Sequence, residues 1–134
     1  MALTLFTCRY PRFQPGMGVP VRTTYGPPRF IGYRLAGHAR LISPTRAILN
    51  LIPDQTAYQD AYLDRLDAAG VDAITEELEA IAAPYDEQPL VLLCFDDLSK
   101  PDGWCHRRMF ADWWTEHTGQ DVPELAEPPR VGLF

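Results

Sequence analysis

The feature that most constrains the fold is an apolar run at Pro89–Phe95, with the sequence PLVLLCF. Apolar and polar residues do not alternate along it, so a strand here would bury both of its faces. Strands of this kind belong to parallel sheets, whose crossover connections are usually helices. We therefore expect a layer of helices on each face of this strand.

Helical patterns flank the run on both sides. Before it, the sequence predicts a short helix that ends at Pro53, a second helix that ends at Gly70 and a third from Asp72 to Pro84. After it, apolar residues at helical spacing predict a helix over residues 106–118. Helices before and after a doubly buried strand indicate an α/β fold.

Two further strands are expected near the N-terminus, at Leu3–Thr7 and Val19–Gly26. Prolines and glycines keep the stretch that follows Gly26 irregular. The 134 residues suit one domain, so we predict a single α/β domain with a mainly parallel sheet of few strands flanked by helices. A proline-rich tail from about residue 121 is expected to be irregular, with one short strand near Val122–Leu125.

Charge and composition exclude some classes of function. The net charge of −6 argues against binding nucleic acid through bulk electrostatics. No apolar run approaches the roughly 20 residues of a membrane span, so no membrane partner is expected. The N-terminal MALTLFTCRY reads as a strand and lacks the features of a signal peptide, which predicts a cytoplasmic protein.

The three cysteines are Cys8, Cys94 and Cys105. An odd number in a chain without a secretion signal predicts reduced thiols, and a disulfide between Cys94 and Cys105 is not expected in a reducing compartment. The absence of a Cys-x-x-Cys pair excludes a zinc ribbon.

Ligands of parallel sheets bind beyond the carboxyl ends of the strands. If the three strands are parallel, their ends meet the loop Gly103–Arg108 (GWCHRR) at one edge. The candidate ligand-binding residues all lie on these segments: Thr7, Cys8, Arg22, Thr23, Thr24, Tyr25, His106 and Arg107.

This loop fits several kinds of chemistry. Arg107 and the start of the following helix could hold a phosphate group. Cys105 could be a nucleophile, because a helix N-terminus and adjacent cations lower a thiol pKa. Cys94, Cys105 and His106, with Cys8 as a fourth ligand, could hold a metal, although adjacent residues chelate one ion poorly. The structural alternative is a helix start with solvated arginines and a buried cysteine.

Asp96, directly after the central strand, is a candidate general base. The alternative is that its carboxylate pairs with an arginine such as Arg107 or caps the loop. Asp96 and Cys105 are thus the two candidate catalytic residues.

The span LVLLCFDDLSKPDGWCHRRMFADWW resembles the hallmark of the bacterial, archaeal and phage family called domain of unknown function 488. The residues that match the family's positions are Cys94, Asp96, Cys105, His106 and Arg107. Asp96 stands where the family more often has Glu, and the tail after Gly119 matches little. Upstream, LFTCRYPRF, PVRTTYGPPRF and ARLISPTRAIL are similar as well. The resemblance implies an α/β fold and implies no activity.

The leading hypothesis is a pocket for a phosphate-bearing, nucleotide-like small molecule, in which Arg22 and Arg107 hold the anion and no cofactor takes part. Whether chemistry follows binding is left open. The second hypothesis is a thiol enzyme that uses Cys105. The third is a protein-interaction module whose Pro- and Arg-rich segments dock a partner, without catalysis.

Overall fold

Four parallel strands form one sheet in the order β1-β4-β2-β3. They are β1 (Leu5–Arg9), β2 (Val19–Arg22), β3 (Gly37–His38) and β4 (Leu90–Cys94). The structure is a computed structural model that describes residues 3–86, 88–95 and 104–125. It confirms the predicted α/β fold, with the apolar run as the central strand β4, all five residues of which are buried. The short strand β3 lies in the stretch that was expected to be irregular.

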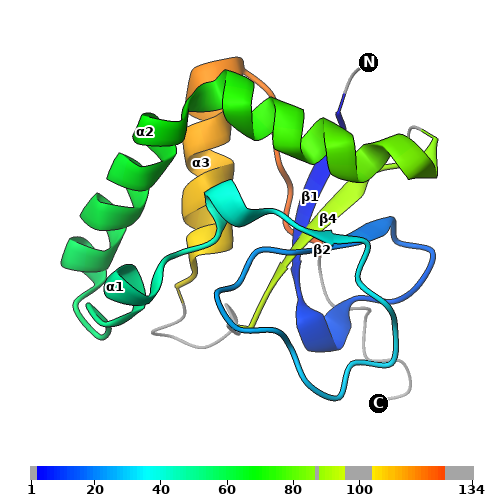
Figure 1. The fold of residues 1–134 in the computed structure, drawn as a ribbon, viewed down its shortest axis with the longest axis horizontal. Coiled ribbons are helices and arrows are strands. Elements are labelled where there is room, and N and C mark those ends of the chain that lie inside the picture. Colours follow the sequence, from blue (N-terminus) through cyan, green and yellow to red (C-terminus); the bar gives the residue numbers. More distant parts are fainter. Residues whose placement is uncertain (1–2, 87, 96–103, 126–134) are drawn as a thin grey trace, which may run out of the picture.

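The helices are α1 (Arg46–Leu49), α2 (Gln55–Ala82) and α3 (His106–Thr118). The bounds of α3 are those that the sequence predicts, and the next residue, Gly119, has the left-handed φ of 79° that ends many helices. The two helices predicted on either side of Gly70 form one element, α2, which bends visibly in Figure 1. Gly70 has φ 83° and ψ 157° and interrupts the helical backbone there. None of the described helices combines the length and apolarity needed to cross a membrane.

Three short 3₁₀ turns, at Tyr10–Arg12, Arg40–Ile42 and Ala83–Tyr85, complete the regular elements.

The two faces of the sheet are covered differently. Leu90 and Leu92 of β4 belong to a core that includes buried residues of α2 and α3, and Figure 1 shows these helices on one side of the strands. Val91 and Leu93 alternate with them and belong to a second core. The partners in this second core come from β1, the first 3₁₀ turn and loops: Phe6, Cys8, Tyr10, Phe13, Met17, Ile31, Tyr33, Leu35 and Leu125. The expectation of helices on both faces is therefore wrong, because loops bury the second face equally well.

The carboxyl ends of the strands meet at one edge, as predicted. Arg9 is paired with Cys94 across β1 and β4, and Arg22 is paired with Leu93 across β2 and β4. Helix α3 starts at the same edge, because Cys105, just before its first residue, is bonded to Cys94 at the end of β4. This edge positions the site described next.

Candidate functional site

Cys94 and Cys105 form a disulfide bond. They end β4 and precede α3, and both side chains are buried. The prediction that they lie close together is confirmed, whereas the expectation that both are reduced thiols is wrong. Cys8 is the free cysteine among the described residues. It cannot join the pair because it packs in the second core, on the opposite face of the sheet from Cys94.

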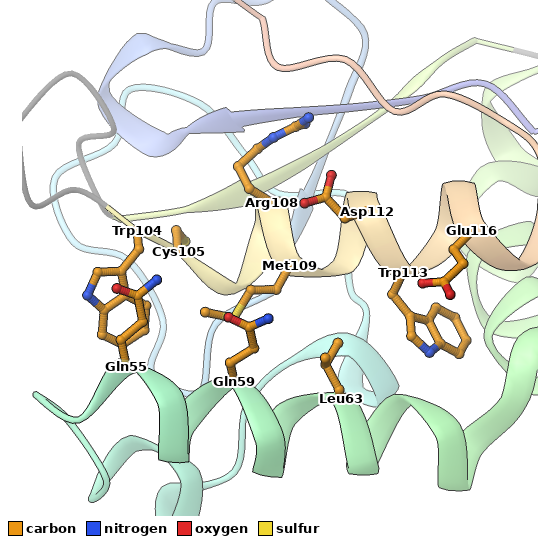
Figure 2. Close-up of a pocket in the computed structure, with 10 residues that line it drawn as sticks. All are labelled: Gln55, Gln59, Leu63, Trp104, Cys105, Arg108, Met109, Asp112, Trp113 and Glu116. Atoms are coloured by element: carbon orange, nitrogen blue, oxygen red, sulfur yellow. The ribbon is translucent and has the colours of Figure 1, made fainter.

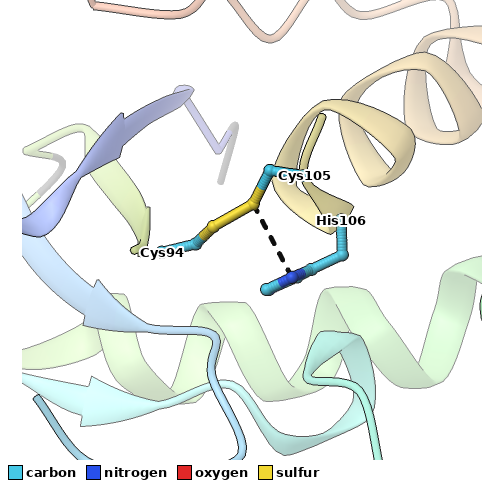
Figure 3. A group of neighbouring side chains, drawn as sticks. All are labelled: Cys94, Cys105 and His106. Carbon is cyan, nitrogen blue, oxygen red and sulfur yellow. Dashed lines mark hydrogen bonds between the residues drawn. A yellow bond between two sulfur atoms is a disulfide. The ribbon is translucent and has the colours of Figure 1, made fainter. Parts of the chain in front are cut away.

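The imidazole of His106 is held in one orientation beside this disulfide (Figure 3). Its Nε2 lies 2.6 Å from the carbonyl oxygen of Thr23, so this nitrogen carries the proton and donates it. Nδ1 is then an acceptor, 3.7 Å from Cys105 Sγ and 3.4 Å from the Tyr58 hydroxyl. Burial, aided by the charge of Arg107, lowers the pKa of His106 to about 4, so the ring is neutral near pH 7.

Arg107 is almost fully buried, with 2% of its surface exposed. Its Nε donates to Glu124 Oε1 at 2.9 Å and its Nη2 donates to Glu124 Oε2 at 2.8 Å, which makes a bidentate ion pair. Its Nη1 donates to Cys94 Sγ at 3.2 Å. The guanidinium that the sequence assigned to a ligand anion is thus bound by a carboxylate of the protein itself.

Glu124 keeps its negative charge although its side chain is partly buried. Burial opposes ionisation of the carboxyl group, but hydrogen bonds from Arg107 and Thr7 outweigh it, and the pKa of Glu124 lies below its usual value. Thr7 Oγ1 donates to Glu124 at 2.6 Å and also accepts a hydrogen bond from Arg108 at 2.9 Å. Thr7 therefore belongs to the site as a support for the ion pair.

The surroundings make the two sulfur atoms of the disulfide chemically different. Cys94 Sγ accepts a hydrogen bond from a guanidinium, which favours a thiolate at that position. Cys105 Sγ faces the acceptor nitrogen of a neutral imidazole, which favours a protonated thiol hydrogen-bonded to the ring. The bond is thus polarised so that Cys94 is the better leaving group.

A pocket of about 460 Å³ lies between α2 and α3, and Cys105 is among the residues that line it. We call it the interhelical pocket (Figure 2). Its lining residues are Gln55, Gln59, Leu63, Trp104, Cys105, Arg108, Met109, Asp112, Trp113 and Glu116. The guanidinium of Arg108 is hydrogen-bonded to Thr7 Oγ1 and to the carbonyl oxygen of Val122.

Sequence reasoning missed the interhelical pocket, although one signal was present. Gln55, Gln59 and Leu63 are spaced by four residues, so they share one face of a helix, and two of the three are polar. The same spacing places Arg108, Asp112 and Glu116 on one face of α3. When each of two packed helices turns a largely polar face toward the other, a pocket between them is expected.

The donor atoms of Cys94, Cys105 and His106 all lie within 4.8 Å of one another in the described structure. Sulfur and imidazole nitrogen are ligands that suit zinc and other borderline or soft metals. The sequence anticipated this trio but placed Cys8 with it, and that placement is wrong because Cys8 lies on the other face of the sheet.

The residues predicted after β2 separate into two groups. Thr23 belongs to the site: its carbonyl orients His106, and its hydroxyl donates to the carbonyl oxygen of Leu93 at 2.7 Å. Thr24 lies outside the site, because its hydroxyl is hydrogen-bonded to the hydroxyl of Tyr10 and to the carbonyl oxygen of Gly26. Tyr25 is 49% exposed and is not part of the buried site.

Arg22 stabilises the turn that follows β2. Its Nε donates to the carbonyl oxygen of Thr24 at 3.0 Å, and its Nη2 donates to that of Tyr25. The hypothesis that Arg22 and Arg107 hold one anion stays a prediction, and in this structure each guanidinium is hydrogen-bonded to the protein. Asp96, the candidate base, lies outside the described residues.

Glu124 is the site residue that the sequence did not predict. It lies in the tail, where a single parallel bridge joins it to Thr7; this bridge is the counterpart of the short strand expected near Val122–Leu125. A buried arginine usually has a carboxylate partner, but the charged start of α3, His106-Arg107-Arg108, does not reveal that Arg107 is the buried one. The sequence also does not reveal which carboxylate is its partner.

No family model, no curated protein and no solved structure matches this chain. The resemblance of residues 90–114 to domain of unknown function 488 therefore stays a prediction. The functional argument rests on the geometry of the site alone.

Proposed function

We propose that this protein is a thiol–disulfide oxidoreductase whose redox centre is the Cys94–Cys105 pair. The observation that carries the proposal is the unequal environment of the two sulfurs, with a guanidinium N–H 3.2 Å from Cys94 Sγ and an imidazole acceptor 3.7 Å from Cys105 Sγ. A disulfide that only stabilises a loop requires neither the guanidinium nor the imidazole beside its sulfur atoms. The cytoplasmic location expected from the sequence fits this role, because disulfides there are usually catalytic or redox-sensing.

The reaction uses a dithiol as the reductant. One substrate thiolate attacks Cys105 Sγ, the bond between the two cysteine sulfurs breaks, and Cys94 leaves with the electron pair as a thiolate beside Arg107. The second substrate thiolate then attacks the substrate sulfur of this mixed disulfide and releases Cys105. The substrate leaves as a disulfide, and two electrons have passed to the protein. One of the two substrate protons ends on Cys105, and the other is released to solvent because Cys94 stays a thiolate beside Arg107.

Access favours Cys105 as the sulfur that meets the substrate. Cys105 lines the interhelical pocket, whereas Cys94 does not. His106 accepts a hydrogen bond from the Cys105 thiol in the reduced protein and is held in place by Thr23. Cys105 is therefore the catalytic cysteine, Cys94 is the resolving cysteine, and Arg107 positions and stabilises the leaving sulfur.

Single-cysteine variants test this assignment. In a Cys8→Ala background, Cys94→Ala leaves Cys105 alone and Cys105→Ala leaves Cys94 alone. Each variant is incubated with 2-hydroxyethyl disulfide, an uncharged reagent, and the mixed disulfide is followed by mass spectrometry. We expect the variant that retains Cys105 to form the adduct faster than the variant that retains Cys94, because Cys105 lines the interhelical pocket and this access outweighs the larger thiolate fraction of Cys94. An absence of adduct in both folded variants, or the reverse order of rates, would overturn the proposal.

A further inference from the structure

The reduced form of the redox centre has the composition of a metal site. The side chains of Cys94, Cys105 and His106 are all buried, and their donor atoms lie within 4.8 Å of one another. Cys105 and His106 are adjacent, and neighbours usually chelate one ion poorly, but here Cys105 Sγ lies 3.7 Å from His106 Nδ1, which is close to the separation of two ligands on one tetrahedral ion. Two thiolates and one imidazole are a donor set that zinc prefers.

His106 is oriented as metal-binding histidines are. Such a histidine donates the proton of its second ring nitrogen to a carboxylate or a backbone carbonyl, which fixes the tautomer and directs the ligating nitrogen. Here Nε2 donates to the carbonyl oxygen of Thr23 at 2.6 Å, and Nδ1 faces the sulfur atoms. This contact is independent of the disulfide, because Thr23 follows β2 and takes no part in the cysteine pair.

Opposite charges lie beside one another at the trio. Arg107, whose Nη1 donates to Cys94 Sγ, forms a bidentate ion pair with the carboxylate of Glu124. A divalent ion would be bound in turn by two thiolates. Each of these charges would then have an opposite charge next to it, which lowers the cost of burying them.

We propose that reduction of the disulfide opens a Zn²⁺ site formed by Cys94 Sγ, Cys105 Sγ and His106 Nδ1. Binding releases the proton of the Cys105 thiol, since Cys94 is already a thiolate, and leaves a fourth position for water or a substrate thiol. The ion and the disulfide exclude each other, since both need the same two sulfurs. The inference rests on the proposed function in one respect, which is that the pair can be reduced in the folded protein.

The test compares the two redox states of the same chain. Wild-type protein is reduced anaerobically with a phosphine, freed of reductant and titrated with Zn²⁺ against a chromophoric chelator, in parallel with the oxidised protein. We expect one ion per chain in the reduced state and none in the oxidised state. Co²⁺ in place of Zn²⁺ should give a sulfur-to-cobalt charge-transfer absorption in the reduced state alone. The Cys8→Ala variant should behave as the wild type does, and His106→Ala should lose the stoichiometric binding.

The outcomes separate the metal site from the redox function. Reduced protein that leaves Zn²⁺ with the chelator overturns the metal site, whether or not the pair exchanges with thiols. Equal binding by oxidised protein, or by folded His106→Ala protein, overturns it as well. Stoichiometric binding by a phosphine-reduced chain that fails to exchange with dithiols or disulfides leaves the metal site standing and overturns the oxidoreductase. A pair that the phosphine cannot reduce without denaturant overturns both.

Discussion

The ion pair between Arg107 and Glu124 holds the guanidinium beside Cys94, in the proposed redox centre. The side chain of Arg107 is 1% exposed and that of Glu124 is 29% exposed, so the guanidinium has little access to water. Removal of one partner of a buried ion pair leaves an uncompensated charge. Any substitution at Glu124 should therefore destabilise the fold and displace the guanidinium from Cys94.

The Glu124→Gln variant tests this contact. It keeps the shape of the side chain and removes its charge, and we expect the free energy of unfolding to fall by about 3 kcal/mol. Urea denaturation measures the change. The control is Glu116→Gln, a change of equal charge at an exposed position, which should alter the free energy of unfolding by less than about 0.5 kcal/mol. Equal losses of unfolding free energy in the two variants would show that the ion pair between Arg107 and Glu124 does not stabilise the fold.

His38 makes the stability of the fold depend on pH. Burial, together with the charges of Arg22 and Arg40, lowers the pKa of His38 from 6.5 to about 4. Its Nε2 lies 3.0 Å from Ser43 Oγ. Because the folded pKa lies below the unfolded pKa, the unfolded chain binds more protons between pH 6.5 and 4. This contribution to stability is fully present above pH 6.5 and is lost as the pH falls to about 4.

The variant His38→Gln should flatten this dependence. Melting temperatures of the wild type and the variant are measured at several values of pH across the window. On acidification, the melting temperature of the wild type should fall further than that of the variant. Parallel losses in the two proteins would show that His38 does not resist protonation in the folded state.

At the scale of the elements, the bend of α2 depends on the backbone of Gly70. Its φ of 83° and ψ of 157° lie in a region that residues other than glycine rarely adopt. A Cβ at this position would meet no atom within 4 Å, so the cost of a side chain comes from the backbone alone. Gly26 offers a matched control, because a Cβ there also meets nothing and its φ is not in the left-handed region.

We therefore expect Gly70→Ala to lower the free energy of unfolding by about 1–3 kcal/mol. Gly26→Ala should change it by less than about 0.5 kcal/mol. Chemical denaturation of both variants measures the difference. A Gly70→Ala protein as stable as Gly26→Ala would indicate that α2 straightens at this position without cost.

The elements that could be predicted are those whose local pattern decides them. Strand β4 and helix α3 follow from an unbroken apolar run and from a helical stripe that ends at Gly119. Strand β3 has only two residues, Gly37 and His38, and depends on hydrogen bonds to β2 that no local pattern reveals. The loops that cover the second face are equally hidden, because Tyr33 and Leu35 lie between prolines and glycines that predict an irregular chain.

At the scale of the whole molecule, the location of the site was predictable and its bonds were not. Parallel strands place their carboxyl ends together, which was enough to gather Cys94, Cys105, His106 and Arg107 at one edge. The sequence could not show that Arg107 binds Glu124, because that contact joins α3 to a tail with little pattern of its own. It also could not separate Cys8 from Cys94, because their faces depend on the strand register.

The fold as a whole sets the condition for the proposed redox activity. The disulfide joins the central strand to the start of α3, whereas hydrogen bonds hold the four strands together and apolar contacts pack α2 against α3. A reduced chain should therefore stay folded, and the pair should cycle within an intact protein.

The most direct test of this account is a redox titration of the native protein. The chain is equilibrated in buffers with different ratios of reduced to oxidised dithiothreitol, without denaturant, and its thiols are trapped by acid and alkylation and counted by mass spectrometry. The account predicts that Cys94 and Cys105 gain and lose two electrons together and reversibly, while the circular dichroism of the fold is retained. A pair that becomes reducible only after the protein is denatured would show a structural disulfide and contradict the account.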